Sequence, residues 1–231
     1  MAGGTTIDLL STQAPQHACT ELVAQFEKAT GNRVKTEFTG TVNVQKRLAA
    51  GESFDLIIMA APAIDEQIRL GRAVACSRVD LAKSGVGVAI RKGAHRPDIG
   101  SVEGFRRTLL AAKSIGYSTG PSGDYMSGLF ERLGVARVIE GKLRRTPSGV
   151  FVGGLIESGE AEIGFQQTSE LLHFRGIDYF GTLPDALQHM TVFSAGIHVG
   201  VKHADTARAL IEFLTAPAAA PVIRKHGLEP V

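Results

Sequence analysis

Ser114-Ile-Gly-Tyr-Ser-Thr-Gly-Pro-Ser-Gly-Asp-Tyr-Met-Ser-Gly128 carries a strand, a loop and the start of a helix. Its first four residues predict the strand, the next four form a loop of small residues, and the pattern is helical from Ser122. A loop that opens a helix presents free backbone N–H groups at the positive end of the helix dipole, which suits an anion. Gly120 and Gly123 let the backbone approach a ligand, and the hydroxyls of Ser118 and Ser122 are donors. An ordinary turn, with Ser122 as the N-cap of the helix, is the alternative interpretation.

Similar turns recur along the chain. The segments that end the predicted strands consist of small or uncharged polar residues: Ser11-Thr12-Gln13, Thr39-Gly40-Thr41, Ala60-Ala61, Ser118 to Ser122 and Gln166-Gln167. In open α/β sheets, ligands bind outside the carboxyl ends of the strands. The repetition therefore favours an anion site over the simple capped helix.

The hydrophobic pattern predicts an α/β protein built from two series of strand–loop–helix units. In the first series, Cys19, Leu22, Val23 and Phe26 follow helical spacing and indicate one buried helical face. The strands of that series are expected at residues 5–10, 33–38 and 54–59. The second series is expected to hold strands at 114–117 and 161–166 and a helix over 148–158.

Two extended segments, residues 84–91 and 191–201, break the rhythm and join the two series. They predict two lobes linked by a double crossover. Residues 1–86 with 197–231 are expected to form lobe 1, and residues 87–196 an inserted lobe 2. If the lobes face each other, the strand-end loops line one cleft between them.

The composition is typical of a soluble globular protein, with 231 residues, 44% of them hydrophobic and 21% charged, and a net charge of +2. This balance predicts neither nucleic-acid binding nor membrane insertion. The strand-end loops make a small anion the expected ligand, and we expect a monomer. Of the two cysteines, Cys19 is expected to be a buried free thiol. The histidines lack metal-ligand spacing, so neither a metal nor another cofactor is predicted.

Several segments spread over nearly the whole chain carry a family resemblance: Phe26-Glu-Lys-Ala-Thr-Gly31, Ala49-Ala-Gly-Glu52, Phe54-Asp-Leu-Ile57, Leu155-Ile-Glu-Ser-Gly-Glu-Ala-Glu-Ile-Gly164 and Phe213-Leu-Thr-Ala-Pro217. With them the chain resembles the type II periplasmic binding-protein family, and within it the molybdate-binding proteins of ABC transporters. The resemblance implies a two-lobed fold with a cleft between the lobes, two crossover segments that act as a hinge, and a small anion as ligand.

Molybdate-binding members hold the dianion with hydroxyls on the first two loops, backbone N–H groups, and a tyrosine after a late strand. Aligned by the flanking segments, the first hydroxyl position falls on Ala14 and the tyrosine position on Gln167, so this chain departs from the pattern twice. These departures predict that carboxylate is preferred over molybdate. The loops and the resemblance together give the expected ligand-binding residues: Ser11, Thr12, Gln13, Thr41, Ser118, Ser122, Gly123, Arg145, Val150 and Gln167.

Three further segments look closer to a side branch of the family that includes aconitate isomerase: Ser114-Ile-Gly-Tyr-Ser118, Ile163-Gly-Phe-Gln-Gln-Thr-Ser-Glu-Leu171 and Val192-Phe-Ser-Ala-Gly-Ile197. This similarity implies an alternative function, a cofactor-independent isomerase that moves a proton between allylic carbons of an unsaturated polycarboxylate.

Such a reaction needs a cation for the carboxylates and a proton shuttle whose pKa lies near the working pH. Arg145 is the best-placed cation, just before the Pro147 turn. His17, in the first turn after the first loop, and Tyr117, at the end of the central strand, are the candidate shuttles. A partly exposed helix histidine and a packed strand tyrosine are the alternative interpretations of the two.

The first residues lead directly into a strand, without the charged start and apolar stretch of a signal peptide. We therefore expect a periplasmic protein if a signal peptide has been removed from this sequence, and a cytoplasmic one otherwise. An ABC transporter permease is an expected partner if the protein is exported.

Overall fold

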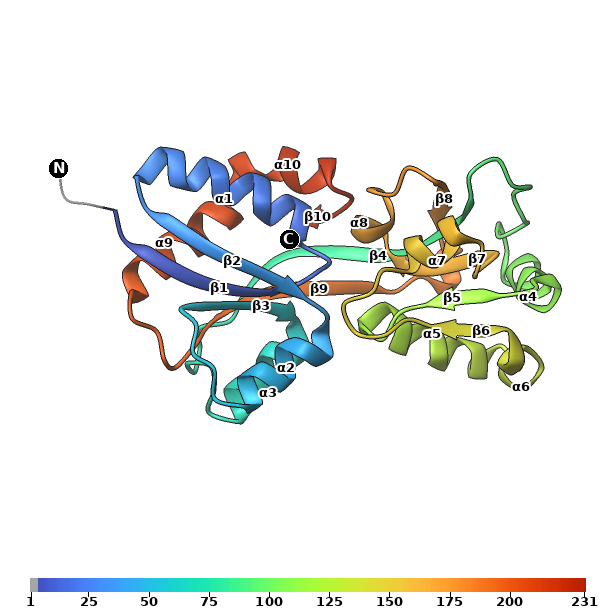
Figure 1. The fold of residues 1–231 in the computed structure, drawn as a ribbon, viewed down its shortest axis with the longest axis horizontal. Helices are drawn as coiled ribbons and strands as arrows, with labels where there is room; N and C mark the ends of the chain where they lie inside the picture. Colours follow the sequence, from blue (N-terminus) through green and yellow to red (C-terminus); the bar gives the residue numbers. More distant parts are fainter. Residues whose placement is uncertain (1–3) are drawn as a thin grey trace. The chain divides into compact units, whose positions relative to one another are not determined.

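The chain passes between two folded units at Ser84–Gly85 and again at Met190–Thr191 in the computed structural model, which describes residues 4–231. Unit 1 holds the chain up to Ser84 together with Thr191–Val231, and unit 2 is the inserted stretch Gly85–Met190. Figure 1 labels the helices and strands of both units. The sequence predicted these crossings after residues 86 and 196. The second lies earlier because the strand that follows it pairs with a strand of unit 1 from Phe193 onward.

Unit 1 is built on a sheet with the strand order β2-β1-β3-β9-β4. Strand β1 is parallel to β2 and β3, whereas β9 is antiparallel to β3 and β10 is antiparallel to β4. The carboxyl ends of the three parallel strands therefore share one edge of the sheet. The bounds are β1 (Thr6–Thr12), β2 (Arg33–Thr39), β3 (Leu56–Ala60), β4 (Val79–Arg91), β9 (Met190–Ile197) and β10 (Glu229–Pro230).

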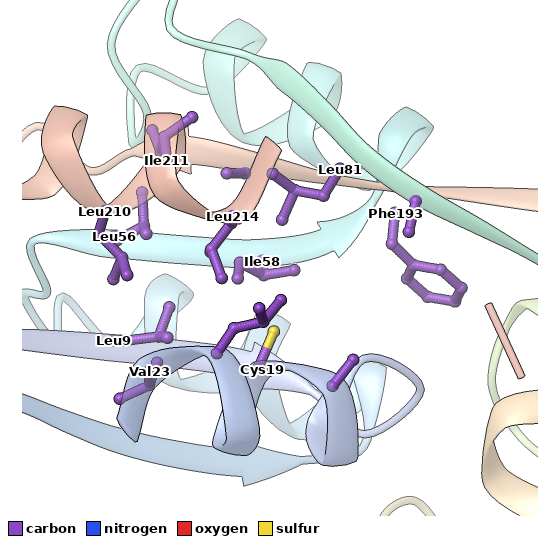
Figure 2. Close-up of a cluster of buried hydrophobic side chains, with 14 of the residues drawn as sticks. Leu9, Cys19, Val23, Leu56, Ile58, Leu81, Phe193, Leu210, Ile211 and Leu214 are labelled. Atoms are coloured by element: carbon purple, nitrogen blue, oxygen red, sulfur yellow. The ribbon is translucent and has the colours of Figure 1, made fainter. Parts of the chain in front are cut away.

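Helices cover both faces of this sheet, because successive side chains of a strand point to opposite faces. Leu9 and Leu56 pack with α1 and α9 on one face (Figure 2), and Leu10 and Ile57 pack with α2 and α3 on the other. Cys19 of α1 is a buried free thiol, as predicted, and its burial raises its pKa to about 12. The helices are α1 (Gln16–Thr30), α2 (Thr41–Ala49), α3 (Ala61–Arg69), α9 (Ala204–Thr215) and α10 (Ala220–Lys225).

Unit 2 is built on a sheet with the order β4-β7-β5-β6, and β8 pairs with β4. Strand β5 is parallel to β6 and β7, so the carboxyl ends of these three strands share one edge. Val86, close to the point where β4 enters the unit, pairs with Gln167 at that same edge. The bounds are β5 (Ile115–Tyr117), β6 (Leu143–Arg145), β7 (Ile163–Gln167) and β8 (Ile177–Thr182).

The helices of unit 2 also form two layers. Phe105 and Phe130 anchor α4 and α5 in a cluster with Phe165 of β7, while Val152 of α7 and Leu171 of α8 belong to a second cluster. The helices are α4 (Val102–Ala111), α5 (Pro121–Arg132), α6 (Ala136–Ile139), α7 (Val152–Ser158) and α8 (Thr168–Leu171).

The predicted α/β class is confirmed, and three local predictions need correction. The helix expected over 148–158 begins at Val152, because a turn precedes it in which the Val150 N–H donates to the Pro147 carbonyl at 3.1 Å. Helix α5 begins at Pro121 with Gly120 as its N-cap, so Ser122 lies inside the first turn. The sequence also missed β6 and α6, whose few residues are too short to show a periodic pattern. The cleft expected between the lobes stays a prediction.

Candidate anion-binding site

The turn between β5 and α5 in unit 2 is closely packed around two serines. Ser118 and Ser122 are buried, and their Oγ atoms lie 3.1 Å apart. A Cβ atom on Gly123 would lie 1.7 Å from the Ser118 carbonyl oxygen, so only glycine fits at this position. The contact between the two hydroxyls uses one of their two protons, and the other remains available to a further acceptor.

Arg145, at the end of β6, lies beside this turn. Its Nη2 pairs with Asp124 Oδ1 at 2.6 Å, its Nε donates to the Ser118 carbonyl at 3.4 Å, and its guanidinium lies 5.6 Å from the centroid of the Tyr117 ring. The Tyr117 ring is buried and meets Phe130 edge to face. A guanidinium has five N–H donors, so Arg145 retains donors for an anion while it is paired with Asp124.

Thr146, which the sequence did not predict as a site residue, also lies at this edge. Its N–H donates to the Tyr117 carbonyl at 2.9 Å, which places it next to the end of β5. Its side chain is 1% exposed, and its hydroxyl has no hydrogen-bond partner among residues 4–231. Burying a hydroxyl without a hydrogen bond costs about 1–3 kcal/mol. A ligand acceptor that bonds to the Thr146 hydroxyl would remove this cost. The one signal in the sequence was its position directly after Arg145.

A glutamate, Glu170, follows β7 at the same strand-end edge of unit 2. Gln166 is buried, and its Oε1 accepts the Val152 N–H at 2.7 Å. Glu170, half-buried in α8, accepts hydrogen bonds from the Gln166 side chain and from the Gln167 backbone N–H. Burial raises the pKa of the Glu170 carboxyl to about 8, against the effect of both hydrogen bonds. The neighbouring Ser169 is 1% exposed, and in the described chain its hydroxyl lacks a partner.

The backbone donor expected at Val150, on the loop before α7, is already used. The Val150 N–H is engaged by Pro147, and the Val152 N–H is engaged by the Gln166 side chain. The Val150 side chain is 46% exposed, and Gly149 has a φ of 89°, which fits the tight turn. Gln167, at the expected tyrosine position, is buried with 1% exposure.

In unit 1, the expected residues also lie at one edge of a sheet. Thr12 pairs with Thr39 where β1 and β2 end, and Thr41 is the first residue of α2, partly exposed. Ser11 is buried and donates its hydroxyl proton to the Thr12 carbonyl at 2.9 Å. The Thr12 hydroxyl is buried at 3% residue exposure and has no partner within the described residues. The Gln13 carbonyl accepts the Gln16 N–H at 2.9 Å, which closes the turn into α1.

His17, one of the two candidate shuttles, packs against the C-terminal helix α10. Its ring stacks on His226 with 6.0 Å between the centroids, and His226 Nε2 lies 2.9 Å from Glu21 Oε2. Burial and the nearby His226 lower the pKa of His17. Ala14, at the expected first hydroxyl position, is buried in the core of unit 1.

Among residues 4–231, no cluster of three or more His, Cys, Asp or Glu side chains could hold a metal ion. In the same range no single helix is long and apolar enough to cross a membrane, although α9 and the bent segment after it pass such a test as a pair.

A family model for bacterial extracellular solute-binding proteins matches residues 7–229. The chain belongs to this family. This solute-binding protein is 36% identical to an aconitate isomerase from a Pseudomonas species, over 98% of its own length and 88% of the relative. It is 26% identical to the molybdate-binding protein of Azotobacter vinelandii, over 90% of its length and 83% of that protein.

Solved structures agree on the fold. The periplasmic molybdate-binding protein of Azotobacter vinelandii superposes with a TM-score of 0.80 at 17% identity, over 96% of this chain and 98% of that one. The predicted resemblance to molybdate-binding proteins, and to the branch with aconitate isomerase, is therefore confirmed at the level of family and fold.

Proposed function

We propose that this solute-binding protein holds a small anion with carboxylate groups at the strand-end edge of unit 2. One observation carries the proposal. The hydroxyls of Thr146 and Ser169 are buried and lack partners within residues 4–231, and both residues follow parallel strands of unit 2. Buried hydroxyls are normally hydrogen-bonded, so two unpartnered ones at this edge of unit 2 support a ligand with several acceptors.

The charges and donors of unit 2 support an anion. Arg145 supplies a cation beside the serine pair Ser118 and Ser122, and neutral donors supply the remaining contacts. Neutral hydrogen bonds contribute about 0.5–1.5 kcal/mol each and charge-assisted ones about 1.5–3 kcal/mol, so about five to seven of them suffice for micromolar affinity in a preorganised site.

Carboxylate is preferred over molybdate because two expected donors for molybdate are replaced. Ala14 stands where a hydroxyl is expected, and its side chain is packed in the core, where it offers no hydrogen bond. Gln167 stands where a tyrosine is expected. The relative with 36% identity is named for aconitate, a tricarboxylate, which agrees with this preference.

Calorimetry with molybdate, sulfate, citrate and trans-aconitate tests the ligand class. We expect a carboxylate to bind, and at a hundred times its Kd to stabilise the protein by about 2.7 kcal/mol. Arg145→Ala should weaken this binding. Arg132→Ala is the matched control, since Arg132 also stacks on a ring, 5.0 Å from the Tyr125 centroid, and should leave the affinity unchanged. Tight molybdate binding without carboxylate binding would refute the preference.

A second candidate function is isomerisation of an unsaturated polycarboxylate, which is favoured by the 36% sequence identity to an aconitate isomerase over 98% of the chain. A base removes a proton from the methylene carbon, the electron pair moves through the allylic system, and a proton returns to the former vinyl carbon. Tyr117 and His17 are the candidates from the sequence, and Glu170 joins them because its raised pKa suits proton transfer at neutral pH.

Proton NMR in deuterated water with saturating trans-aconitate tests the isomerase hypothesis. We expect formation of cis-aconitate together with deuterium in the substrate pool, without any effect of a chelator. If neither product nor deuterium exchange is detected, the isomerase hypothesis is wrong, and ligand binding without catalysis remains the proposed function.

The family description and its periplasmic and ABC-transporter relatives support export of the natural protein, with an ABC transporter permease as partner. A monomeric state is part of the proposal and has no support beyond it. Cell fractionation of the native source and light scattering of the purified protein test both points. A cytoplasmic pool without a periplasmic one would remove the transporter from consideration.

A further inference from the structure

We propose that Glu170 brings a proton into the anion site of unit 2 and shares it with a carboxylate of the bound ligand. The inference rests on the proposed carboxylate binding and deepens it, because it names the group that recognises a carboxylate by a carboxylic O–H. Glu170 would act as a hydrogen-bond donor at the edge where Arg145 supplies the positive charge.

The geometry begins with Gln166. Its Oε1 accepts the Val152 N–H at 2.7 Å in a buried position, so its amide NH₂ must point elsewhere. That NH₂ donates to the Glu170 carboxyl, which also receives the Gln167 N–H. Strand β7, helix α7 and helix α8 are thereby tied together through one amide, and the Glu170 carboxyl is held at the carboxyl end of β7.

Two incoming N–H bonds leave the carboxyl with further capacity. A protonated carboxyl group can accept both and still donate its own O–H. Burial keeps the pKa of Glu170 at about 8, so the group carries a proton at neutral pH. An O–H that faces a ligand carboxylate forms a charge-assisted hydrogen bond, about twice as strong as a neutral one. A carboxylate ligand thus gains a donor here, whereas an ionised Glu170 would repel it.

Other titratable side chains lie on the elements around α8 and on the loop that follows it: Glu157, Asp178, Tyr179, His173, Arg175 and, on β4, Lys83. Glu157 accepts the Gly176 N–H at 2.7 Å, and Asp178 accepts the Gly93 N–H at 3.0 Å, so both carboxylates are bound to backbone. The Tyr179 hydroxyl lies 3.5 Å from Thr168 Oγ1. His173 and Arg175 are exposed to solvent, and Lys83 pairs with Glu229 in unit 1. Burial and the two hydrogen bonds are the causes that set the pKa of Glu170.

Calorimetry with propane-1,2,3-tricarboxylate tests the shared proton, since this saturated probe binds like a polycarboxylate but cannot isomerise. The titrations are run in two buffers of different ionisation enthalpy, from neutral pH to about one unit above the pKa. We expect the wild-type protein to take up close to one proton per ligand above pH 8, and its affinity to fall about tenfold per pH unit there. Glu170→Gln should abolish the proton uptake and the pH dependence.

Glu162→Gln is the matched control. Glu162 is also a carboxylate fixed by a backbone N–H, that of Lys113 at 2.6 Å, but it precedes β7 and so lies at the opposite end of that strand. This variant should keep the proton uptake of the wild type. If Glu170→Gln does not fold, carboxyl-carbon NMR of the glutamate-labelled wild type replaces it: one carboxyl should titrate near pH 8 and move to higher pH when the probe binds.

The outcomes separate the two proposals. Tight binding of the probe without proton uptake, or uptake that persists in Glu170→Gln, overturns the role of Glu170 and leaves carboxylate binding intact. No binding of any carboxylate at any pH overturns the proposed function, and the role of Glu170 with it.

Discussion

Replacing Thr146 by valine should stabilise the free protein and weaken its ligand binding. The Thr146 side chain is 1% exposed, and its hydroxyl has no partner within the described chain. Valine keeps the branched shape and removes the oxygen. A structural threonine would behave in the opposite way, because its hydroxyl would have a partner to lose.

The magnitude follows from the unsatisfied hydroxyl. Its burial without a partner costs about 1–3 kcal/mol, and removal of the oxygen should recover about 1 kcal/mol of that penalty. For a chain of this size, 1 kcal/mol corresponds to a rise of about 2–4 °C in Tm. In the complex, the same change removes a hydrogen bond to a charged ligand, worth about 1.5–3 kcal/mol, so affinity should fall roughly tenfold to a hundredfold.

Thr108→Val provides the matched control in the same unit. Thr108 is also buried, but its hydroxyl donates to the Asp98 carbonyl at 2.7 Å. This variant should lower the Tm, because it leaves that carbonyl without its donor, and it should not change ligand affinity. Differential scanning fluorimetry measures the change in Tm of each variant relative to the wild type, and calorimetry measures the change in ligand affinity. If Thr146→Val lowers the Tm as much as Thr108→Val does, the hydroxyl is satisfied in the free protein and the reasoning is refuted.

Further predictions concern the packing and the titrating groups. Gly123→Ala should destabilise unit 2 by about 1–3 kcal/mol and abolish carboxylate binding, because its Cβ would lie 1.7 Å from the Ser118 carbonyl oxygen; a variant with native Tm and affinity would contradict this. Glu170→Gln should become more stable relative to the wild type as pH rises from about 5 to about 9. The folded protein holds the Glu170 proton up to about pH 8, whereas the unfolded chain releases it near the ordinary glutamate pKa of 4.5, so the wild type loses stability across that window. Parallel urea curves of the two proteins at all pH values would disprove it. Iodoacetamide at pH 8 should label Cys76, which is exposed, and spare Cys19, whose pKa is about 12; mass spectrometry showing equal labelling would contradict the buried placement.

The layers of the fold could be predicted because they depend on local periodicity. Leu9 and Leu10 are adjacent residues of β1 that pack in different clusters, as the alternation of a strand requires. Cys19 and Phe26 share one face of α1 because they are seven residues apart on a helix. Such patterns need no knowledge of which elements become neighbours. Segments such as β6, with three residues, carry too little of a pattern to be recognised.

The candidate site could be predicted in part. Strand-end loops of small polar residues identified Ser118 and Ser122, since the carboxyl ends of parallel strands meet at one edge. Arg145 was expected near this loop, and its guanidinium does contact Ser118. The sequence did not reveal that Val150, an expected ligand-binding residue, uses its N–H inside its own turn.

The sequence by itself determined the α/β class, the order of the strand–helix units, and the small polar loops at the strand ends, since each depends on residues close together in the chain. Tertiary structure alone decided which of those polar groups are satisfied. The Gln166 amide meets the Val152 N–H fourteen residues away, and this contact turns its NH₂ toward Glu170. Thr146 is buried beside β5 without a partner for its hydroxyl in the described chain. Burial and hydrogen bonding depend on neighbours that folding brings together. These two properties set the pKa of Glu170 and leave the Thr146 hydroxyl without a hydrogen bond.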